Sequence, residues 1–343
     1  MTFKLFTRDG FRERVFERDG HTCVVCKRGP PGLDAHHVIE RKLWSDGGYF
    51  IENGVTVCEE HHREAEATTL SCDRLRELAG ITNFPIPEHL YRDQPYDKWA
   101  NPILPNGLRL RGELFDDPSV QRVLTPVLAL FTNRVKYPRT YHLPWSPGVT
   151  KDDRIQTDLS GFEDQEVIVT EKLDGENTTL YRDYMHARSV DYEPHPSRSW
   201  IRATHSRLAH DIPEGWRVCG ENLFAKHSIH YKNLTSYFQV FSIWNEKNEC
   251  LSWDETLEWS QLLQLPTVPV LYRGPWDEKA LRALTPTSPQ GDPCEGYVVR
   301  VAAAFRYREF RSKVAKFVRA QHVQTHGHWM RQTIERNGLA DPK

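Results

Sequence analysis

The sequence predicts an α+β protein with at least two domains, and three observations lead to this fold class. The chain has 343 residues, more than one compact domain usually contains. Cysteine and histidine residues cluster near the N-terminus, which is typical of a small metal-stabilised domain. Beyond residue 135, short strand-like runs alternate with turn residues, so a larger, strand-rich domain is expected there.

The composition argues against a membrane protein and against a uniformly basic protein. No apolar run approaches the ~20 residues of a membrane span, and the N-terminus lacks a signal-peptide pattern. The net charge is -2, so contacts with nucleic acid depend on local basic patches. Ten tryptophans and a hydrophobic content of 38% supply enough apolar surface for real cores. Cysteines clustered with histidines indicate metal binding in a reducing compartment, and we expect a cytoplasmic protein.

Two ligand pairs in the first domain, residues 1–68, have the spacing of a zinc site. Cys23 and Cys26 form a C-x-x-C pair, and Cys58 and His61 form a C-x-x-H pair. Thiolate and imidazole groups are the ligands of structural Zn²⁺, and two such pairs complete one tetrahedral site. A lone C-x-x-C pair is also compatible with a buried pair or a redox motif, and the second pair favours zinc.

The residues between and after these pairs resemble the HNH (ββα-metal) nuclease family. The pattern consists of the pair His36-His37, Asn53 five residues before Cys58, and His62 directly after the last zinc ligand. The resemblance implies that His37 is the general base that activates water and that Asn53 orients it or assists the metal. It also implies that His36 and His62 hold one catalytic divalent ion. The alternative is a zinc module that has kept its fold and only docks nucleic acid.

Helices and an extended segment are expected around these motifs. A short amphipathic helix is predicted over 11–18, and a capped helix over 71–80. A further helix is predicted over 120–131 despite Pro126. Residues 69–134 are otherwise rich in Pro, Asn and Tyr, which predicts an ordered, extended connector that wraps the neighbouring structure.

A lysine at the end of an apolar run marks the second domain, residues 135–343. Residues 167–172 end in Lys172, which is followed by the turn Asp174-Gly175 and by Asn177. This K-x-D-G-x-N pattern resembles the nucleotide-attachment motif of covalent nucleotidyltransferases, the superfamily of ATP-dependent ligases and capping enzymes. Asn after the turn resembles RNA ligases. The resemblance implies an ATP-grasp-like domain built from antiparallel sheets.

Further stretches follow in the order of the superfamily's motifs. Arg188 stands where the family's arginine engages nucleotide or 5′-phosphate, and Glu221 where a carboxylate accepts the ribose hydroxyl. Phe241 matches the aromatic residue that stacks on adenine, although Ser242 replaces a frequent Asp and a plain core strand explains the stretch nearly as well. Glu295 matches the glutamate that binds the divalent ion, directly or through water.

The last motif departs from the family pattern. The usual spacing is Lys-x-Lys, whereas this chain has Lys313 and Lys316. In a strand these residues face opposite sides, so Lys316 is favoured for the α-phosphate, with Lys313 assisting. Only 24 residues follow Arg319, so no OB-fold is expected. A good amphipathic helix with a capping box is predicted over 252–265.

The resemblance implies an ATP-dependent polynucleotide ligase, with AMP carried on Lys172 and with Mg²⁺ or Mn²⁺. We expect nearby cations to lower the pKa of Lys172 and activate its amine. The expected partners are RNA or DNA ends in a nicked duplex, with no obligate protein partner and a role in repair, processing or defence. The alternatives are a non-catalytic end-binding protein and a DNA ligase. The expected nucleotide-contacting residues are Glu171, Asp174, Asn177, Arg188, Glu221, Phe241, Glu295, Lys313 and Lys316.

Overall fold

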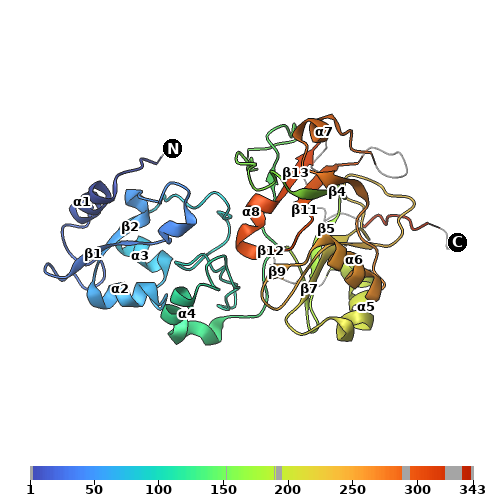
Figure 1. Cartoon of the computed structure of the whole chain (residues 1–343). Helices are drawn as coiled ribbons and strands as arrows, with labels where there is room; N and C mark the ends of the chain where they lie inside the picture. The colour runs from blue at the N-terminus through green and yellow to red at the C-terminus, as the bar shows by residue number, and fades with distance from the viewer. Residues whose placement is uncertain are drawn as a thin grey trace. The chain divides into compact units, whose positions relative to one another are not determined.

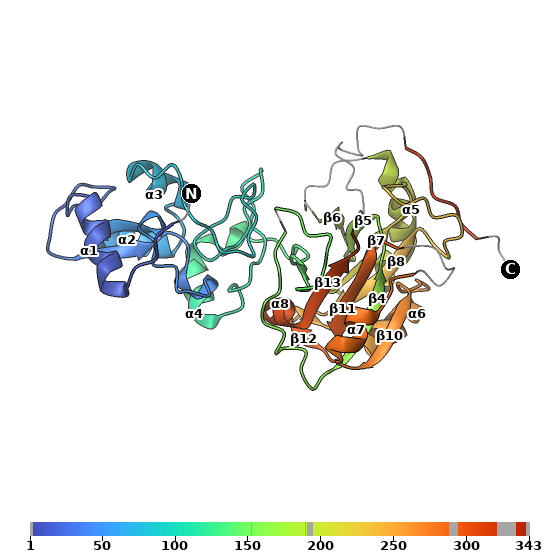
Figure 2. The ribbon, with the colours of Figure 1, turned by 90° about the horizontal axis from the view of Figure 1, so that it is seen from above.

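The computed structural model divides the chain into two compact units, Met1–Val135 and Lys136–Lys343 (Figure 1; Figure 2). No helix in the part of the chain that is described combines the length and the apolar character needed to cross a membrane. The structure describes residues 3–151, 153–188, 190, 195–287, 294–320 and 334–340.

The first unit is built on a β-hairpin flanked by two helices. Strands β1 (Leu33–His37) and β2 (Gly54–Cys58) pair antiparallel. Helix α1 (Arg8–Arg18) starts earlier than predicted because the Thr7 side chain caps it, accepting a hydrogen bond from the Gly10 N–H at 3.2 Å. Helix α2 (Glu59–Glu66) leaves the end of β2 directly. The hairpin therefore brings the chemistry-bearing residues of β1 next to those of α2.

The connector helices match the prediction at one place and differ at another. Helix α3 (Cys72–Leu78) has Ser71 as its N-cap, as the sequence predicts. The prediction of a single helix over 120–131 was wrong. The α-helix α4 (Pro118–Leu124) ends at Leu124, and residues Thr125–Leu130 form a 3₁₀ helix. Pro126 explains the break, because proline lacks the N–H that an α-helix needs at this position.

The connector shares a hydrophobic core with the hairpin. Val55 and Val57 of β2 belong to the same buried cluster as Leu75, Leu90 and Ala100, which come from the connector. A second small cluster lies around Trp99, Phe115 and α4. The segment 69–134 is thus packed into the first unit through apolar contacts, which places its polar side chains near those of β1 and α2.

Two sheets form the second unit. The five-stranded sheet has the order β10-β4-β11-β13-β3, in which only the β13–β3 pair is parallel. The six-stranded sheet is antiparallel and has the order β12-β9-β8-β7-β5-β6. This mixed α/β architecture with antiparallel sheets agrees with the predicted class. The strands are β3 (Tyr141–His142), β4 (Glu166–Lys172), β5 (Glu176–Leu180), β6 (Met185–Ala187), β7 (Arg217–Asn222), β8 (Phe238–Trp244), β9 (Glu249–Cys250), β10 (Val270–Pro275), β11 (Gly296–Val301), β12 (Phe305–Arg306) and β13 (Val314–Val318).

Apolar clusters hold these sheets together. One cluster joins Val167, Val169 and Val299 of the five-stranded sheet to Cys219 and Trp244 of the six-stranded sheet. Another covers the six-stranded sheet with residues of α5 (Ser199–Leu208) and of the segment after α6 (Trp253–Leu262). Helix α6 begins with the predicted capping box of Ser252 and Glu255, which is confirmed. Two short helices, α7 (Glu278–Ala283) and α8 (Phe310–Lys313), complete the unit.

Candidate active site

The predicted lysine lies where the chain crosses from one sheet to the other. Strand β4 belongs to the five-stranded sheet and β5 to the six-stranded sheet, so the turn Lys172–Gly175 joins the two. A Cβ atom on Gly175 would lie 2.6 Å from the carbonyl oxygen of Asn222, which only glycine avoids. The turn therefore packs tightly against the end of β7, and Lys172 is held at the junction of both sheets.

Lys172 forms a close ion pair with the predicted metal-binding glutamate. Its Nζ lies 2.6 Å from Glu295 Oε2, and the register that places Gly296 opposite Lys172 brings the two together. Burial disfavours the ammonium form, but Glu295, Glu221 and Asp174 outweigh it and raise the pKa of Lys172. The expected lowering is therefore not produced by the charges of the chain itself. Activation of the amine requires a cation that offsets these carboxylates.

Glu221 and Asn177 face the same side of the six-stranded sheet, because they are paired across β7 and β5. Burial, together with Glu295 and Asp174, raises the pKa of Glu221 to about 8, against the influence of Lys172. Acidic side chains gathered at one point repel each other, and a divalent cation relieves this repulsion. The negative charges of these residues attract a cation such as Mg²⁺ or Mn²⁺, although among the described residues they do not form a group of three ligand atoms within 4.8 Å of one another. A carboxylate such as Glu221 can also accept a ribose hydroxyl.

Asp174 has a structural role that the sequence did not reveal. Its Oδ2 accepts hydrogen bonds from the backbone N–H of Ser228 at 2.8 Å, from the Ser228 hydroxyl at 2.6 Å and from the Ile229 N–H at 2.8 Å. The Asp174 N–H donates to the Tyr231 hydroxyl at 2.9 Å. The carboxylate thus fixes the loop after β7. Burial lowers the pKa of His227 in this loop, although the negative charges of the site oppose the effect.

That loop is in turn held by a segment near the C-terminus. Asn337 Nδ2 donates to the carbonyl oxygen of Leu223 at 2.8 Å, and its Oδ1 accepts from the Tyr231 N–H at 2.9 Å. The Gly338 N–H donates to the Tyr231 carbonyl oxygen at 2.8 Å. Because Tyr231 also contacts Asp174, residues 334–340 support the turn that carries Lys172. No local motif around Asn337 signals this role.

Lys316 is the downstream lysine that shares the site with Lys172. Burial lowers the pKa of Lys316, and the positive charges of Lys172 and Arg188 add to the effect, whereas Asp153 opposes it. Its Nζ lies 3.3 Å from Asp153 Oδ1, which also lies 3.2 Å from His142 Nε2. Asp153 is thus the anchor of Lys316, and no motif in the sequence indicates this role.

Lys313 is directed elsewhere, and for a reason that differs from the expected one. It ends helix α8 rather than belonging to β13, so the argument from alternating strand faces does not apply. Its Nζ donates to the carbonyl oxygen of Gly161 at 3.1 Å. This contact does not include any of the acidic residues around Lys172.

The remaining predicted residues lie at varying places around the turn. Phe241 packs edge-on against Tyr137, with ring centroids 5.1 Å apart, and contacts two core clusters. Arg188 follows β6, and its backbone N–H donates to the carbonyl oxygen of Asn177 at 3.1 Å. Glu171 is buried and precedes Lys172 on β4, so its side chain leaves the opposite face of the strand.

In the first unit, the four predicted zinc ligands converge. The ligand atoms of Cys23, Cys26, Cys58 and His61 all lie within 4.8 Å of one another. His61 Nδ1 lies 3.1 Å from Cys58 Sγ and 3.5 Å from Cys23 Sγ. The donor set of three sulfurs and one imidazole nitrogen is one that zinc prefers. A Cys₃His site is therefore present, and it fits Zn²⁺.

A second cluster contains His36 and His62, together with Glu66, which the sequence reasoning missed. The ligand atoms of these three residues also lie within 4.8 Å of one another. His36 is only 2% exposed, and neither ring nitrogen has a hydrogen-bond partner, which suits a metal ligand. Glu66 lies one helical turn after His62 on α2, a spacing that could have revealed it.

His37 and Asn53 lie on the other side of this cluster. His37 stacks on Phe11 with ring centroids 4.5 Å apart, and burial, Lys98 and Arg41 lower its pKa to about 4. The Asn53 side chain accepts from the Ile39 N–H at 2.9 Å and donates to the Ile39 carbonyl oxygen at 3.0 Å. Asn53 thus fixes the backbone after His37, and these contacts involve no metal-ligating side chain.

Comparison with known proteins agrees with the second unit's site. Residues 165–318 match the sequence model of the RNA ligase family, which is less than half of the chain. This stretch contains Lys172, Glu221, Glu295 and Lys316, and the match supports an RNA ligase domain there. The first unit lies outside it. No match among curated proteins was found.

Solved structures give partial likenesses. A putative ATP-dependent DNA ligase from Aquifex aeolicus shares 18% identity at a TM-score of 0.38, covering 68% of this chain and 55% of that one. An archaeal ATP-dependent RNA ligase shares 16% at a TM-score of 0.37, covering 54% and 48%. An RNA ligase from Naegleria gruberi, solved with PPi, shares 15% at a TM-score of 0.43, covering 94% and 84%. The chain spans about half the length of the first two proteins.

Proposed function

We propose that the second unit is an ATP-dependent RNA ligase that acts through a lysyl-AMP intermediate. The observation that carries the proposal is the placement of Lys172 at the junction of two sheets, in contact with Glu295 and near Glu221 and Lys316. A partly buried lysine among acidic groups that attract a divalent cation is suited to attack a polyphosphate. The family match over the same residues supports this reading.

The proposed chemistry has three steps. The ammonium of Lys172 loses its proton, its nitrogen bonds to the α-phosphorus of ATP, and the bond to pyrophosphate breaks. A 5′-phosphate oxygen of the nucleic acid then takes AMP from Lys172. A 3′-hydroxyl finally attacks this activated phosphate, forms the phosphodiester and releases AMP. Glu295 would hold a divalent ion, which supplies positive charge to neutralise the phosphates.

Other residues of the site would bind and orient the nucleotide. Lys316 offers its positive charge to the α-phosphate, and Arg188 to a terminal phosphate. Glu221 would accept the ribose hydroxyl, with Asn177 on the same face of the sheet. Phe241 is the proposed ring for adenine. We assign Asp174 to the positioning of the turn, because its carboxylate already accepts hydrogen bonds from the Ser228 loop.

A panel of nicked duplexes tests this function. With ATP and Mg²⁺ or Mn²⁺, we expect joining at nicks where an RNA strand ends in a 3′-hydroxyl next to a 5′-phosphate. Joining is measured as a longer product on a denaturing gel. Matched nicks with a 5′-hydroxyl should stay open, because they offer no phosphate to accept AMP. Joining of DNA strands alone would support a DNA ligase instead. Binding of ends without any joining would support the end-binding alternative.

For the first unit, we propose an HNH-type metal-dependent endonuclease stabilised by zinc. Two metal-compatible clusters support it, one of the Cys₃His type and one formed by His36, His62 and Glu66. Since its pKa is lowered to about 4, His37 is neutral near neutral pH and would accept a proton from water as a weak base. His36, His62 and Glu66 would hold a divalent ion, which steadies the charge of the leaving oxygen.

Nicking of supercoiled plasmid tests the nuclease. We expect nicking in the presence of Mg²⁺ or Mn²⁺, and a loss of about 100-fold or more in His37→Ala, the usual range for removing a general base. The Lys172→Ala variant serves as a control for ligase chemistry and should nick normally. Persistent nicking by His37→Ala would contradict the role of His37. If the unaltered protein does not nick any substrate, the docking-module alternative is favoured.

The two activities together suggest a protein that cuts and rejoins nucleic acid in repair, processing or defence. The proposed parts are a zinc-bearing nuclease domain over 1–68, a connector over 69–134 and the ligase domain over 135–343. The described cysteines form no disulfide, and four side chains gather as a Cys₃His group. This use of cysteine favours a reducing compartment such as the cytoplasm.

A further inference from the structure

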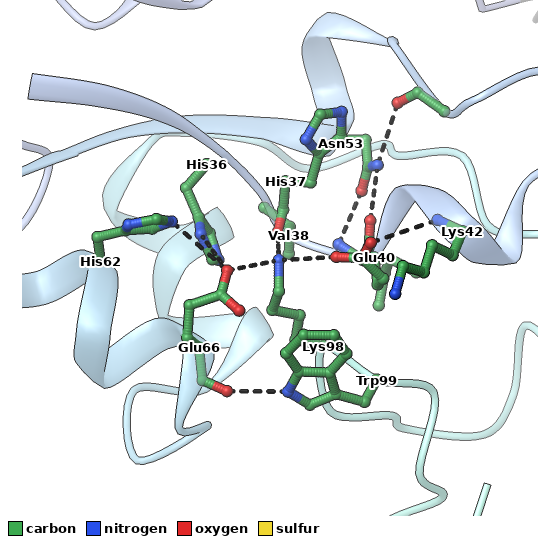
Figure 3. Close-up of polar contacts among 12 residues, drawn as sticks. His36, His37, Val38, Glu40, Lys42, Asn53, His62, Glu66, Lys98 and Trp99 are labelled. Carbon is green, nitrogen blue, oxygen red and sulfur yellow. Dashed lines mark hydrogen bonds and ion pairs between the residues drawn. The ribbon is translucent and has the colours of Figure 1, made fainter. Parts of the chain in front are cut away.

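A lysine from the connector reaches the second cluster of the first unit. Lys98 is only 3% exposed, and lysine is rarely buried without a partner. Figure 3 shows its side chain pointing toward Glu66, with Glu40 on the other side of the ammonium group. The Nζ lies 3.0 Å from Glu66 Oε1 and 3.4 Å from Glu40 Oε2, and it donates to the His37 carbonyl oxygen at 3.1 Å.

Three side chains approach the same carboxylate oxygen. Besides Lys98 Nζ, Glu66 Oε1 has His62 Nε2 at 3.4 Å and His36 Nδ1 at 3.5 Å. These two imidazole nitrogens and this oxygen are the atoms that would bind a divalent ion (Figure 3). The ammonium therefore already contacts the single anionic ligand of the group. A metal ion on the two histidines has to share Glu66 with Lys98 or displace it.

The backbone around Lys98 holds the side chain in this place. The Lys98 carbonyl oxygen accepts a hydrogen bond from the Glu40 N–H at 2.9 Å. The indole Nε1 of Trp99 donates to the backbone carbonyl oxygen of Glu66 at 2.8 Å. Residues 98 and 99 thus contact both the carboxylate and the carbonyl of Glu66. Such anchoring makes withdrawal of the ammonium unfavourable, so its charge stays close to the metal ligands.

The charges predict the direction of the effect. An ammonium group and a divalent ion that contact the same oxygen repel each other, and the repulsion is stronger in a buried site than in water. The ammonium also neutralises Glu66, which removes much of the attraction that a carboxylate offers to a cation. Glu40, on the far side of Lys98, balances part of this charge but contributes no ligand to the group of three.

We propose that Lys98 is a built-in competitor for the divalent ion at His36, His62 and Glu66, so that it lowers the affinity of this site. The proposal rests on the nuclease function proposed above, because it takes this cluster as the metal site. It adds a residue that sets how much free divalent ion the first unit needs. The site then fills only when the free ion concentration is high enough to overcome the ammonium.

Binding of Mn²⁺ to the full chain tests the proposal, followed by electron paramagnetic resonance of the free ion. The ligase site also binds Mn²⁺, so each protein is compared with its own His62→Ala derivative, and only the His62-dependent binding is counted. Lys98→Gln removes the charge but keeps a hydrogen-bond donor, and Lys98→Arg keeps the charge. We expect Lys98→Gln to bind at least tenfold more tightly than the unaltered protein, and Lys98→Arg to bind alike.

The Lys98→Gln variant is expected to be less stable without metal, since the partly buried carboxylates of Glu40 and Glu66 lose their partner, and unfolding measurements keep the test decisive in that case. Added Mn²⁺ should then raise the unfolding temperature of Lys98→Gln more than that of Lys98→Arg. Equal or weaker His62-dependent binding in Lys98→Gln would overturn the competitor role and leave the metal site standing. Absence of His62-dependent binding in every variant would overturn the metal site and the competitor role together.

Discussion

Replacing Lys172 by alanine is expected to abolish the transfer of label from α-labelled ATP to the protein. Lys172 is the amine that lies at the junction of the sheets, 2.6 Å from Glu295, and alanine has no nitrogen that could bond to the α-phosphorus. The labelled band on a denaturing gel should fall to background. Persistent labelling of Lys172→Ala at the same site would remove the proposed intermediate.

Two further lysines provide a matched pair for this experiment. Lys316→Ala should reduce labelling strongly, by about 100-fold, because a positive charge near the reacting phosphate is lost. Lys313→Ala should retain labelling within a few-fold, since its ammonium donates to the Gly161 carbonyl oxygen instead. A larger loss of labelling in Lys313→Ala than in Lys316→Ala would assign the α-phosphate to Lys313 instead of Lys316.

The same assay has an expected pH dependence. The reactive amine form of Lys172 becomes more abundant as the pH rises. Because Glu295 and Glu221 raise the pKa of Lys172, this increase, and with it the increase in labelling rate, is expected on the alkaline side of neutrality. More Mg²⁺ should move this rise to lower pH, because the cation offsets the carboxylates. A rate that is independent of pH at every Mg²⁺ concentration would contradict the role of the two glutamates.

Removal of zinc is expected to unfold the first unit. Structural zinc contributes about 10–16 kcal/mol of apparent binding free energy in small domains, which exceeds the stability of most domains. Cys58 ends β2 and His61 lies in the first turn of the following helix, so the metal would tie the hairpin to α2. In Cys58→Ala, we expect loss of bound zinc and loss of hydrogen-exchange protection in residues 1–135.

Cys72→Ala is the control for this experiment. Cys72 is buried and lies outside the Cys₃His group, and burial raises the pKa of its thiol to about 12. This variant should keep one zinc per chain and lose only about 1 kcal/mol, the usual effect of a small change in a core. If Cys58→Ala kept full protection of the hairpin, zinc would not be required for the fold of the first unit.

The sequence predicted those parts of the sites that depend on local spacing. Cys23 and Cys26 lie three residues apart, as do Cys58 and His61, and such pairs were sufficient to find the Cys₃His group. The sequence also singled out Glu221, although its pairing with β5 became visible only in the register of the strands. Local patterns therefore located residues, and the sheets decided which side chains meet.

The missing parts depend on contacts between distant segments. Lys98 lies 61 residues from His37, whose carbonyl oxygen it contacts, and no motif links the two positions. Asn337 and Asp153 act on Tyr231 and Lys316 in the same way, across long stretches of chain. Periodicity and spacing report only on neighbours along the helix or strand, so such partners cannot be read from them.

The division of the Lys172 site between two sheets has a mechanical consequence. Lys172, Glu295 and Lys316 belong to or border the five-stranded sheet, whereas Asn177 and Glu221 belong to the six-stranded one. A nucleotide that contacts both groups would resist sliding of one sheet relative to the other, because such sliding would break its phosphate contacts or its sugar contacts. We therefore expect the two sheets to move less relative to each other when a nucleotide is bound than when the site is empty. Release of AMP would restore this motion.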